Sequence, residues 1–281
     1  MLKYYVQTAS FSRELRKDFH GCMEKIAAAG YAGVELFDKI YGGYSSASLE
    51  KYLESLNMVI IGAHVDLELI PEQLEYFFNT ECKYIVCPGI HVSSADEAIS
   101  AARRFNEYGR QVAAAGMKFG YHNHNSDFDH YEGKSVIEIF IESTDPELVT
   151  FELDAAWAWR SGIDAQAFIA EHVNRFELIH LKETSRVLTP EDSFEAMIKK
   201  YGLTIGENGR PVMNEAAKAA FAEHIKINCA LGKGLINPPA LIPTAVSQGA
   251  NAFIVEREYA YTGDIFTSLA EDAAYLYNLG L

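Results

Sequence analysis

Pairs of ionisable residues spaced two positions apart recur through the second half of the sequence. The pairs are His122 and His124, Glu152 and Asp154, His180 and Lys182, and Glu256 and Glu258. Each pair comes at the end of a short apolar run, and side chains two residues apart lie on the same face of a β-strand. Imidazole and carboxylate groups without a thiolate suit Mn²⁺, Co²⁺, Zn²⁺, Fe²⁺ or Mg²⁺ better than Ca²⁺. The pattern therefore indicates a divalent metal site, provided that the strands bring the pairs together.

One residue from each pair gives a candidate set of ligands. The set is His122, Asp154, His180 and Glu256. Such a set leaves positions open on the metal for oxygen atoms of a substrate. The alternative is that these residues are structural, because a single histidine that faces inward from a strand is usually a hydrogen-bonded core residue. Four successive runs that end in this way favour the metal site.

The elements that must position these residues are short apolar runs that alternate with amphipathic segments. We expect strands at Leu2–Ala9, Ala32–Phe37, Val59–Val65, Tyr84–Gly89, Lys118–Asn125, Thr150–Trp159, Phe176–Glu183 and Asn251–Glu258. We expect helices at Arg13–Ala29, Ser48–Leu56, Ala95–Ala115, Ser135–Glu142 and Ala165–His172. Apolar runs without strict polar alternation are typical of parallel strands covered on both faces. Eight such βα units predict an α/β fold, a (β/α)8 TIM barrel, in which the carboxyl ends of the strands meet at one mouth.

Local signals support several of the expected helix ends. Ser12 and Asp164 are suitable caps for the helices that follow them, because their side chains can accept a hydrogen bond from a free backbone N–H. Gly30 and Gly116 follow expected helices, where a left-handed residue is often needed.

One interval breaks the regular spacing. The chain between the seventh and eighth expected strands is longer than a βα unit requires, and we interpret residues 184–228 as an insertion into a single domain of residues 1–281. The insertion is either a surface excursion or a lid or partner arm, because it leaves a strand at the face where barrel active sites form.

Composition excludes several classes of protein. The chain has 281 residues, 49% of them hydrophobic, so it can bury a core without disulfides. Its formal charge of −15 repels polyanions, which argues against a protein that binds nucleic acid or anionic membranes. The four cysteines have no metal-binding spacing, and no leader or membrane-spanning run is evident, so we expect buried thiols in a soluble cytoplasmic protein.

Five motifs resemble the sugar phosphate isomerase/epimerase family, the xylose isomerase-like TIM barrels. They are YHNHNSDF at 121–128, ELDAAWAWRSGID at 152–164, HLKE at 180–183, LGKGLIN at 231–237 and IVERE at 254–258. The runs GYAGVELF at 30–37 and GAHV at 62–65 are similar to the second and third strands of the family. The resemblance covers nearly the whole chain and includes a subgroup with the motif YHNHxxEF.

The resemblance implies the metal-binding role of Asp154, His180 and Glu256. Three positions depart from the patterns of the family. His122 stands where the ketose epimerases have a glutamate that binds metal and moves the proton, and Asp127 replaces the glutamate of the YHNHxxEF subgroup. Asn237 also replaces an aspartate in the LGKGLIN motif. A mechanism with two glutamates is therefore in doubt.

The chemistry expected of this site is proton abstraction from a carbon next to a carbonyl group, assisted by the metal. Glu256 is the preferred acid or base, with His64, His124 and Lys182 as further candidates. We expect substrate contacts from Gln7, Glu35, His64, His124, Trp157 and Lys182. The run GKG at 232–234 is a weak signal for a phosphate, so the expected substrate is an unphosphorylated sugar or keto-cyclitol.

Three functions fit the sequence. The first is a metal-dependent isomerase or epimerase of a free sugar or keto-sugar. The second is a lyase or dehydratase of a keto-cyclitol of the inosose type or of a 3-keto-glycoside, on the same metal. The third is a non-catalytic sugar-binding barrel, because a fold alone does not determine function. A homo-oligomer that uses the insertion as a contact is compatible with each of them.

Overall fold

A closed barrel of eight parallel strands forms the centre of the protein. The computed structural model describes residues 1–206 and 211–281. The strands are β1 (Tyr4–Gln7), β2 (Gly33–Leu36), β3 (Val59–His64), β4 (Tyr84–Cys87), β5 (Lys118–His122), β8 (Val149–Asp154), β9 (Phe176–Leu181) and β12 (Ala252–Val255). Their order around the barrel is β1-β12-β9-β8-β5-β4-β3-β2, which follows the chain and closes between β1 and β12. The predicted (β/α)8 TIM barrel is confirmed.

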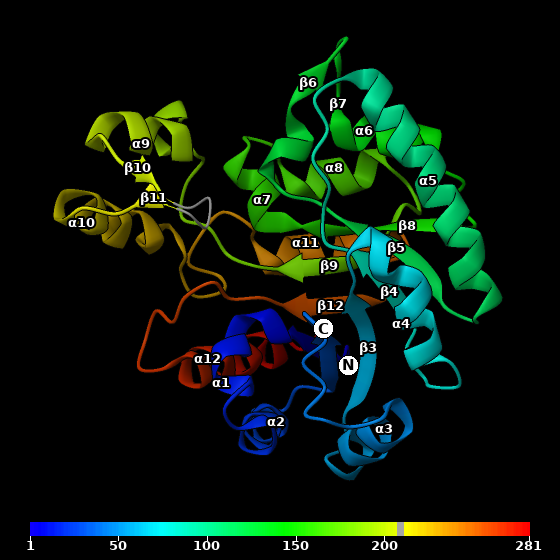
Figure 1. The fold of residues 1–281 in the computed structure, drawn as a ribbon. Coiled ribbons are helices and arrows are strands. Elements are labelled where there is room, and N and C mark those ends of the chain that lie inside the picture. The colour runs from blue at the N-terminus through cyan, green and yellow to red at the C-terminus, as the bar shows by residue number, and fades with distance from the viewer. Residues whose placement is uncertain (207–210) are drawn as a thin grey trace.

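Helices surround the barrel, as Figure 1 shows. They are α1 (Ser12–Leu15), α2 (Phe19–Ala28), α3 (Ser46–Ser55), α4 (Ile70–Phe77), α5 (Ala95–Ala114), α6 (Val136–Ser143), α7 (Ala155–Arg160), α8 (Ala165–Glu171), α11 (Pro238–Ser247) and α12 (Ile265–Asn278). A short hairpin of β6 (His130–Tyr131) and β7 (Lys134–Ser135) precedes α6. The two ends of the chain meet, because the backbone N–H of Leu2 donates to the carbonyl of Leu281 at 2.9 Å.

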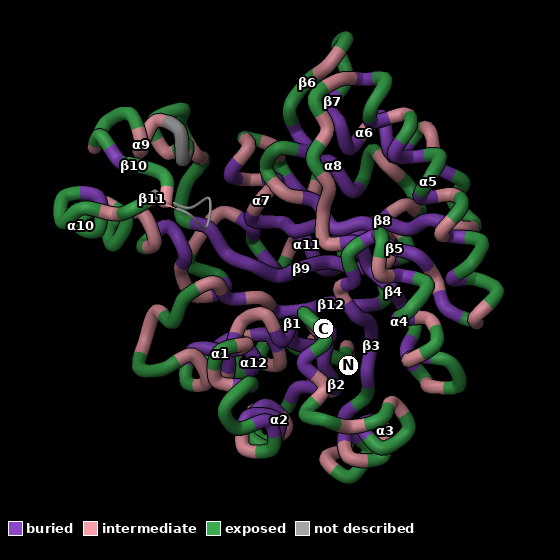
Figure 2. The backbone as a smooth tube through the Cα atoms, in the orientation of Figure 1, coloured by how far each residue is buried: buried purple, intermediate pink, exposed green. Residues whose placement is uncertain are grey.

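The strands are buried on both faces, which explains their continuous apolar character. The larger apolar core lies between the strands and the helices, and Figure 2 shows the strands as the buried centre of the molecule. A smaller core fills the inside of the barrel. Its members are Tyr5, Ile61, Tyr84, Val86, Leu178, Ala252 and Ile254. These side chains fill the barrel interior below the polar residues of the mouth, so the barrel is a packed core and not a pore.

Two of the predicted helix signals are corrected at the start of the chain. The expected helix Arg13–Ala29 is broken into α1 and α2, and α2 is capped by Asp18, whose side chain accepts from the backbone N–H of Gly21 at 2.9 Å. Ser12 is the first residue of α1 and not its cap. An Asp cap competes with continuation of the helix because it satisfies the backbone locally.

The other predicted helix ends are confirmed. Asp164 caps α8 by accepting from the N–H groups of Gln166 and Ala167. Gly30 and Gly116 have φ values of 93° and 84°, the left-handed conformation that ends a helix.

The sixth barrel strand is shorter than predicted. The expected strand reached Trp159, whereas β8 ends at Asp154 and α7 begins at Ala155. Asp154 itself causes the change, because its Oδ1 accepts from the backbone N–H of Trp157 at 2.9 Å and so starts a helix. Both tryptophans of this segment therefore lie on a helix.

The insertion contains its own short elements. They are α9 (Phe194–Tyr201), β10 (Thr204–Ile205), β11 (Pro211–Val212) and α10 (Glu215–His224). Residues 207–210, part of the expected turn cluster, lie outside the described residues. Figure 1 shows these elements as a lobe on the side toward which β9 and β12 run, that is, the mouth side of the barrel. The stem of the lobe is held where the N–H of Ser185 donates to the carbonyl of Ile227 at 2.8 Å.

The expectation of four buried thiols holds for three of them, because Cys229 is partly exposed. All four cysteines are free, and Cys22, Cys82 and Cys87 are buried. Among the described residues, none of the helices has the length and apolar character needed to cross a membrane.

Candidate metal centre

The structure brings the four predicted ligands together at the mouth of the barrel. Each of His122, Asp154, His180 and Glu256 offers one ligand atom, and these atoms all lie within 4.8 Å of one another. Strand register explains the proximity, because Asp154 pairs directly with His180 across β8 and β9. Glu256 comes directly after β12, which is the next strand around the barrel. We call these four residues the mouth set.

A lysine lies among the carboxylates of the mouth. The Nζ atom of Lys182 is 3.1 Å from Glu258 Oε1 and 3.4 Å from both Asp154 Oδ2 and Glu256 Oε2. Burial alone would lower the pKa of Lys182, but the three carboxylates outweigh burial and raise it, so the ammonium stays charged. Burial likewise opposes ionisation of Glu256, yet Lys182 and His180 hold its pKa well below the ordinary value. Glu256 is therefore an ionised carboxylate at neutral pH.

A second polar layer lies beneath the mouth set. It consists of Glu35 from β2, His64 from β3 and Glu152 from β8, together with the inner nitrogen atoms of His122 and His180. We call it the deep layer. The side chains of Glu35 and Glu152 are fully buried. Gln7 closes this layer, because its Nε2 donates to Glu35 Oε2 at 2.6 Å.

Two histidines connect the mouth set with the deep layer. His180 places Nδ1 at 3.0 Å from Glu256 Oε2 and Nε2 at 2.8 Å from Glu35 Oε2. His122 places Nδ1 at 3.0 Å from Glu152 Oε2. A carboxylate behind a histidine fixes the ring orientation and raises the basicity of the other nitrogen, an arrangement common behind metal-binding histidines.

The residues fit a divalent cation. Five carboxylates, Glu35, Glu152, Asp154, Glu256 and Glu258, gather here against two fixed cations, Lys182 and Arg160. Asp154 Oδ2 is buried and has no hydrogen-bond partner among the residues that the structure describes. An excess of buried negative charge with a free acceptor atom is costly unless a cation completes it. His122, Asp154, His180 and Glu256 are the residues that would hold such an ion.

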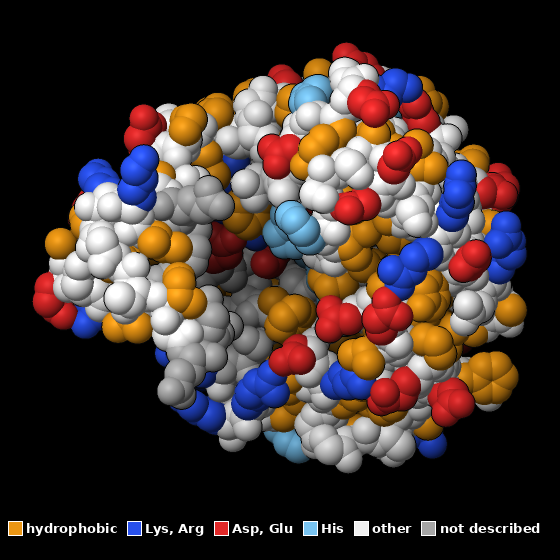
Figure 3. Space-filling model, turned by 45° about the horizontal axis from the view of Figure 1, so that its top comes forward, with side chains coloured by type: hydrophobic (Ala, Val, Ile, Leu, Met, Phe, Trp, Pro, Cys, Tyr) orange, Lys and Arg blue, Asp and Glu red, His pale blue; other side chains and the backbone are white. Residues whose placement is uncertain are grey.

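The rim of the mouth carries an aromatic side chain between polar groups. The Trp157 ring is 5.6 Å from the His124 ring and 4.8 Å from Lys182 Nζ, measured to the ring centroids. Burial, followed by the charge of Lys182, lowers the pKa of His124 to about 4, so this imidazole is neutral at pH 7. Figure 3 shows a hollow between the insertion and the barrel, with acidic side chains inside it and a histidine at its edge.

The predicted substrate-contact residues divide between the rim and the deep layer. His124 and Trp157 are partly exposed at the rim, and the buried Lys182 lies next to the Trp157 ring. Gln7 and Glu35 are buried and bond to each other, and His64 Nε2 is held by Glu152 Oε2 at 2.7 Å. The latter three residues support the histidines of the mouth from below.

Sequence reasoning missed Arg160, which joins the insertion to the mouth. Its buried guanidinium lies 3.4 Å from Glu258, donates to Asn228 Oδ1 at 2.8 Å and lies 4.5 Å from the centre of the Trp157 ring. Its carbonyl accepts from the N–H of Leu188 at 2.8 Å. Both ends of the insertion are therefore fixed to the helix that follows Asp154. Only the position of Arg160, one helical turn after Trp157, could have indicated this role.

Sequence reasoning also missed Glu183, and this residue explains the GKG run. Its carboxylate accepts from the backbone N–H groups of Gly232, Ile236 and Thr184 at 3.0–3.1 Å. A side chain at Gly234 would clash with it, since a Cβ there would lie 2.5 Å from Glu183 Oε1. Within the GKG run, the N–H of Gly232 thus already binds a carboxylate of the protein, and the N–H of Lys233 donates to the carbonyl of Ala230.

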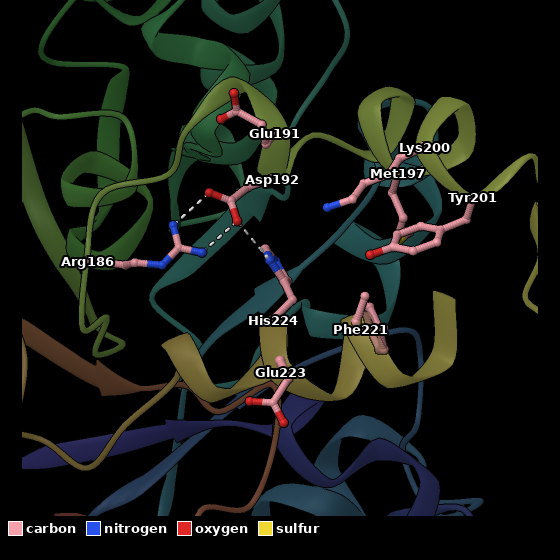
Figure 4. Close-up of a pocket in the computed structure, with 10 residues that line it drawn as sticks. Arg186, Glu191, Asp192, Met197, Lys200, Tyr201, Phe221, Glu223 and His224 are labelled. Atoms are coloured by element: carbon pink, nitrogen blue, oxygen red, sulfur yellow. Dashed lines mark hydrogen bonds and ion pairs between the residues drawn. The ribbon is translucent and has the colours of Figure 1, made fainter. Parts of the chain in front are cut away.

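A separate pocket lies within the insertion. It has a volume of about 360 Å³ and is lined by residues of α9, α10 and the segment before α9. Figure 4 shows that Arg186 faces the Asp192 carboxylate with its two terminal nitrogen atoms, and that the His224 ring approaches the same carboxylate. This pocket contains none of the mouth residues.

Comparison with solved structures places the fold in a known class. A sugar phosphate isomerase/epimerase from Parabacteroides distasonis ATCC 8503 is similar over 98% of this chain and 95% of that chain, with 22% identity and a TM-score of 0.73. The probable 3-DHS dehydratase AsbF of Bacillus anthracis, involved in petrobactin synthesis, covers 99% of each chain with 14% identity and a TM-score of 0.71. The IolI protein with a binding zinc atom covers 99% of this chain and 98% of its own, with 14% identity and a TM-score of 0.69.

These comparisons define the class of fold. The chain has the fold of the xylose isomerase-like TIM barrels, and the resemblance given by the sequence motifs is confirmed at that level. Sequence comparison with family models and with curated proteins finds no match. Identities of 22% or less to these three structures carry no substrate to this chain, so its activity is argued from its own site.

Proposed function

We propose that this protein is a divalent-metal-dependent isomerase or epimerase that removes a proton next to the carbonyl group of a free sugar or keto-sugar. The observation that carries the proposal is the mouth set, four potential ligand atoms within 4.8 Å of one another at the carboxyl ends of neighbouring strands. The fold class agrees with it, because solved structures of this fold are described as sugar phosphate isomerase/epimerase and as L-ribulose 3-epimerase.

A divalent ion held by the mouth set would make this reaction possible at neutral pH. A proton on carbon is too weakly acidic for a carboxylate unless the charge that develops on the neighbouring oxygen is stabilised, and a bound divalent ion supplies that stabilisation. The protein supplies the base. When the base takes the proton, the electrons of the C–H bond form a double bond to the carbonyl carbon, and the π electrons of the carbonyl group move to its oxygen. Return of the proton to another carbon gives the isomer, and return to the other face gives the epimer.

Glu256 is the preferred acid and base. It is ionised, it is less deeply buried than the other members of the mouth set, and its Oε2 lies next to His180 and Lys182. Lys182 keeps its charge and is placed to hold a hydroxyl or carboxylate group of the substrate. His124 is neutral and serves as a hydrogen-bond donor or a second base on the rim. His64, tied to Glu152, is better placed to support the metal ligands than to contact substrate.

The chemical class of the substrate follows from the surroundings of the site. Three carboxylates, Asp154, Glu256 and Glu258, surround the single ammonium of Lys182. In the glycine-rich run, the N–H of Gly232 binds the Glu183 carboxylate, and the N–H of Lys233 binds a backbone carbonyl. An unphosphorylated polyhydroxy ketone or keto-cyclitol therefore suits the mouth better than a sugar phosphate. The exposed part of Trp157 offers a surface on which the apolar face of such a ring packs.

A lyase or dehydratase is the second candidate. Its specific support is His122, which occupies the β5 position where an epimerase of the two-glutamate type needs a carboxylate. With no second glutamate in the mouth set, loss of a hydroxyl or glycosyl group after proton removal competes with return of the proton. The likeness to a probable dehydratase is compatible with this outcome. A non-catalytic sugar-binding barrel is the third candidate, and it predicts ligand binding without exchange of any carbon-bound proton.

One experiment separates these candidates. The purified protein is analysed for metals, reconstituted with Mn²⁺, Co²⁺, Zn²⁺ or Fe²⁺, and incubated in heavy water with a panel of ketoses, inososes and 3-keto-glycosides. Deuterium in recovered substrate or in an isomer supports the isomerase or epimerase. An unsaturated or shortened product identifies the lyase. Binding without deuterium uptake at any tested metal contradicts both enzymatic proposals.

Replacement of Glu256 by Gln tests the base. Glutamine keeps the size of the side chain but cannot accept a proton, so we expect deuterium uptake to fall by roughly 10²–10⁴-fold while substrate affinity changes much less. Nuclear magnetic resonance of the substrate measures the uptake. Exchange at the native rate in Glu256→Gln would remove Glu256 from the role of base.

A further inference from the structure

The geometry points to a second cation site in the deep layer, formed by His64, His122, Glu152 and His180 with Glu35 beside them. We propose that this site binds a transition-metal ion of its own, below the ion of the mouth set. The inference concerns metal binding alone and does not depend on which reaction occurs at the mouth.

The donor atoms of the deep layer are spaced as ligands of one ion. One atom from each of His64, His122, Glu152 and His180 lies within 4.8 Å of the others. Three nitrogen atoms lie near Glu152 Oε2: His64 Nε2 at 2.7 Å, His122 Nδ1 at 3.0 Å and His180 Nε2 at 3.2 Å. Two lie near Glu35 Oε2: His180 Nε2 at 2.8 Å and His64 Nε2 at 3.3 Å. Ligands about 2.1 Å from a shared ion are themselves roughly 2.9–3.4 Å apart, and three of these five nitrogen-to-oxygen distances fall in that range.

The carboxylates of the deep layer are incompletely satisfied by the protein. Several nitrogen atoms lie within hydrogen-bond distance of Glu152 Oε2 and of Glu35 Oε2. The Oε1 atom of each residue is buried and has no hydrogen-bond partner in the part of the chain that the structure describes. Three imidazoles thus contact one oxygen atom of Glu152, and the other oxygen atom of this carboxylate contacts none of them within hydrogen-bond distance. An ion between the imidazoles and the carboxylates would use the free oxygen atoms.

The charge of the deep layer points the same way. Glu35 and Glu152 are fully buried, and among the described residues their ion-pair partners are histidines, with no lysine or arginine. The mouth set, in contrast, has Lys182 at 3.4 Å from two of its carboxylates. In the deep layer, histidines are therefore the side chains available to balance two buried carboxylates, and a metal ion held by those histidines would supply positive charge there.

The deep site is distinct from the mouth set although they share two residues. His180 directs Nδ1 toward Glu256 in the mouth and Nε2 toward Glu35 and Glu152 below. His64 and Glu152 belong only to the deep site, and Asp154 and Glu256 belong only to the mouth set. Three imidazoles favour Zn²⁺, Co²⁺ or Fe²⁺ over Mg²⁺ and Ca²⁺ in the deep site.

Metal counting tests the inference without any activity assay. The full-length protein is stripped with chelator, reconstituted with Zn²⁺ or Co²⁺, and freed of excess ion, after which the metal content per chain and the visible spectrum of the Co²⁺ form are measured. Three variants are compared with the native protein: His64→Gln for the deep site, Asp154→Asn for the mouth set, and His20→Gln as a matched control, because His20 is exposed and its ring bonds only to Tyr44 in the described structure.

We expect about two ions per native chain and about one in each of His64→Gln and Asp154→Asn, with different Co²⁺ spectra because different ligands remain. His20→Gln should match the native protein. One ion per native chain that is lost in Asp154→Asn and kept in His64→Gln overturns the deep site and leaves the proposed function standing. One ion that is lost in His64→Gln and kept in Asp154→Asn supports the deep site and overturns the mouth set. If His64→Gln does not fold, the native protein and Asp154→Asn decide, because one ion per native chain that is lost in Asp154→Asn contradicts the inference.

Discussion

The mouth of the barrel and the pocket of the insertion both gather charged side chains, yet they differ in how those charges are satisfied. In the insertion, Arg186 and Asp192 pair through two contacts of 2.6 Å, and the Arg186 side chain is 45% exposed. At the mouth, Asp154 and His180 are fully buried, and Asp154 keeps an oxygen atom without a hydrogen-bond partner among the described residues.

The difference shows why the size of a hollow is a poor guide to function. The pocket of the insertion has a volume of about 360 Å³, but Arg186 and His224 pair with Asp192 there, and the Arg186 side chain is partly exposed (Figure 4). The mouth concentrates three carboxylates around one lysine, and one of them also faces Arg160. Buried charge that awaits a partner is costly, and such cost is typical of sites that bind an ion or act on a substrate.

The strongest test of the comparison is to remove one charge from the mouth. Asp154→Asn keeps an oxygen atom to cap α7, because Asn is as good a cap as Asp, but removes the negative charge. We expect metal affinity to fall by at least about 100-fold and turnover to fall with it, while the melting temperature of the metal-free protein changes little. Elemental analysis and calorimetry measure both effects. Undiminished metal content would mean that Asp154 is not a ligand.

A smaller effect is expected at Glu183, which lies next to the mouth but has a structural role. Glu183→Gln places an amide NH₂ against backbone N–H groups of Thr184, Gly232 or Ile236, so one or more charge-assisted hydrogen bonds are lost. We expect a loss of about 1.5–3 kcal/mol of unfolding free energy. Metal content should stay native. A variant that keeps its stability and loses its metal would contradict this division of roles.

His124 gives the comparison a pH dependence. Burial lowers its pKa in the folded state from 6.5 to about 4, so the unfolded chain binds more protons between these values. Stability therefore falls as the pH decreases from 6.5 toward 4, by an amount on the order of 1–3 kcal/mol for this group. The Asn side chain of His124→Asn cannot take up the proton. The difference in unfolding free energy between the native protein and this variant, measured with urea, should therefore shrink or reverse as the pH falls from 6.5 to 4. A difference that does not vary with pH would show that His124 is not buried as described.

The smallest effect is expected in the insertion. Asp192→Asn removes the charge that faces Arg186 and His224, but the pair with Arg186 is partly exposed and the amide still accepts from the N–H of Thr189. We expect a change of no more than about 1 kcal/mol in stability. Metal content and deuterium exchange should remain native. A loss of exchange with retained metal would instead make the insertion part of the active site and support its interpretation as a lid.

The sequence allowed the barrel and the mouth set to be predicted for a clear reason. Parallel strands buried on both faces appear as apolar runs, and the two-residue period of a strand places His122, Glu152, Asp154 and His180 on the inner face without knowledge of the packing. Eight such runs, each followed by a helical segment, predict a closed barrel. The remaining unknown was the register between strands, which the structure supplies by pairing Asp154 with His180.

Other features depend on contacts that a single sequence does not display. Asp18 breaks the first helix because it bonds to its own backbone, and Asp154 ends β8 in the same way, although both lie in continuous apolar patterns. The deep layer joins Glu35 and His64 to His180, and these residues are up to 145 positions apart. Arg160 reaches Asn228 at the far end of the insertion. None of these contacts produces a period or a spacing in the chain.

Anomalous X-ray scattering from crystals of the Zn²⁺- or Co²⁺-reconstituted protein tests the central claim most directly, since it locates each ion. The account predicts an anomalous peak about 2.0–2.2 Å from ligand atoms of His122, Asp154, His180 and Glu256. Absence of a peak at the mouth in fully reconstituted protein, or a peak held only by residues outside these four, would contradict it.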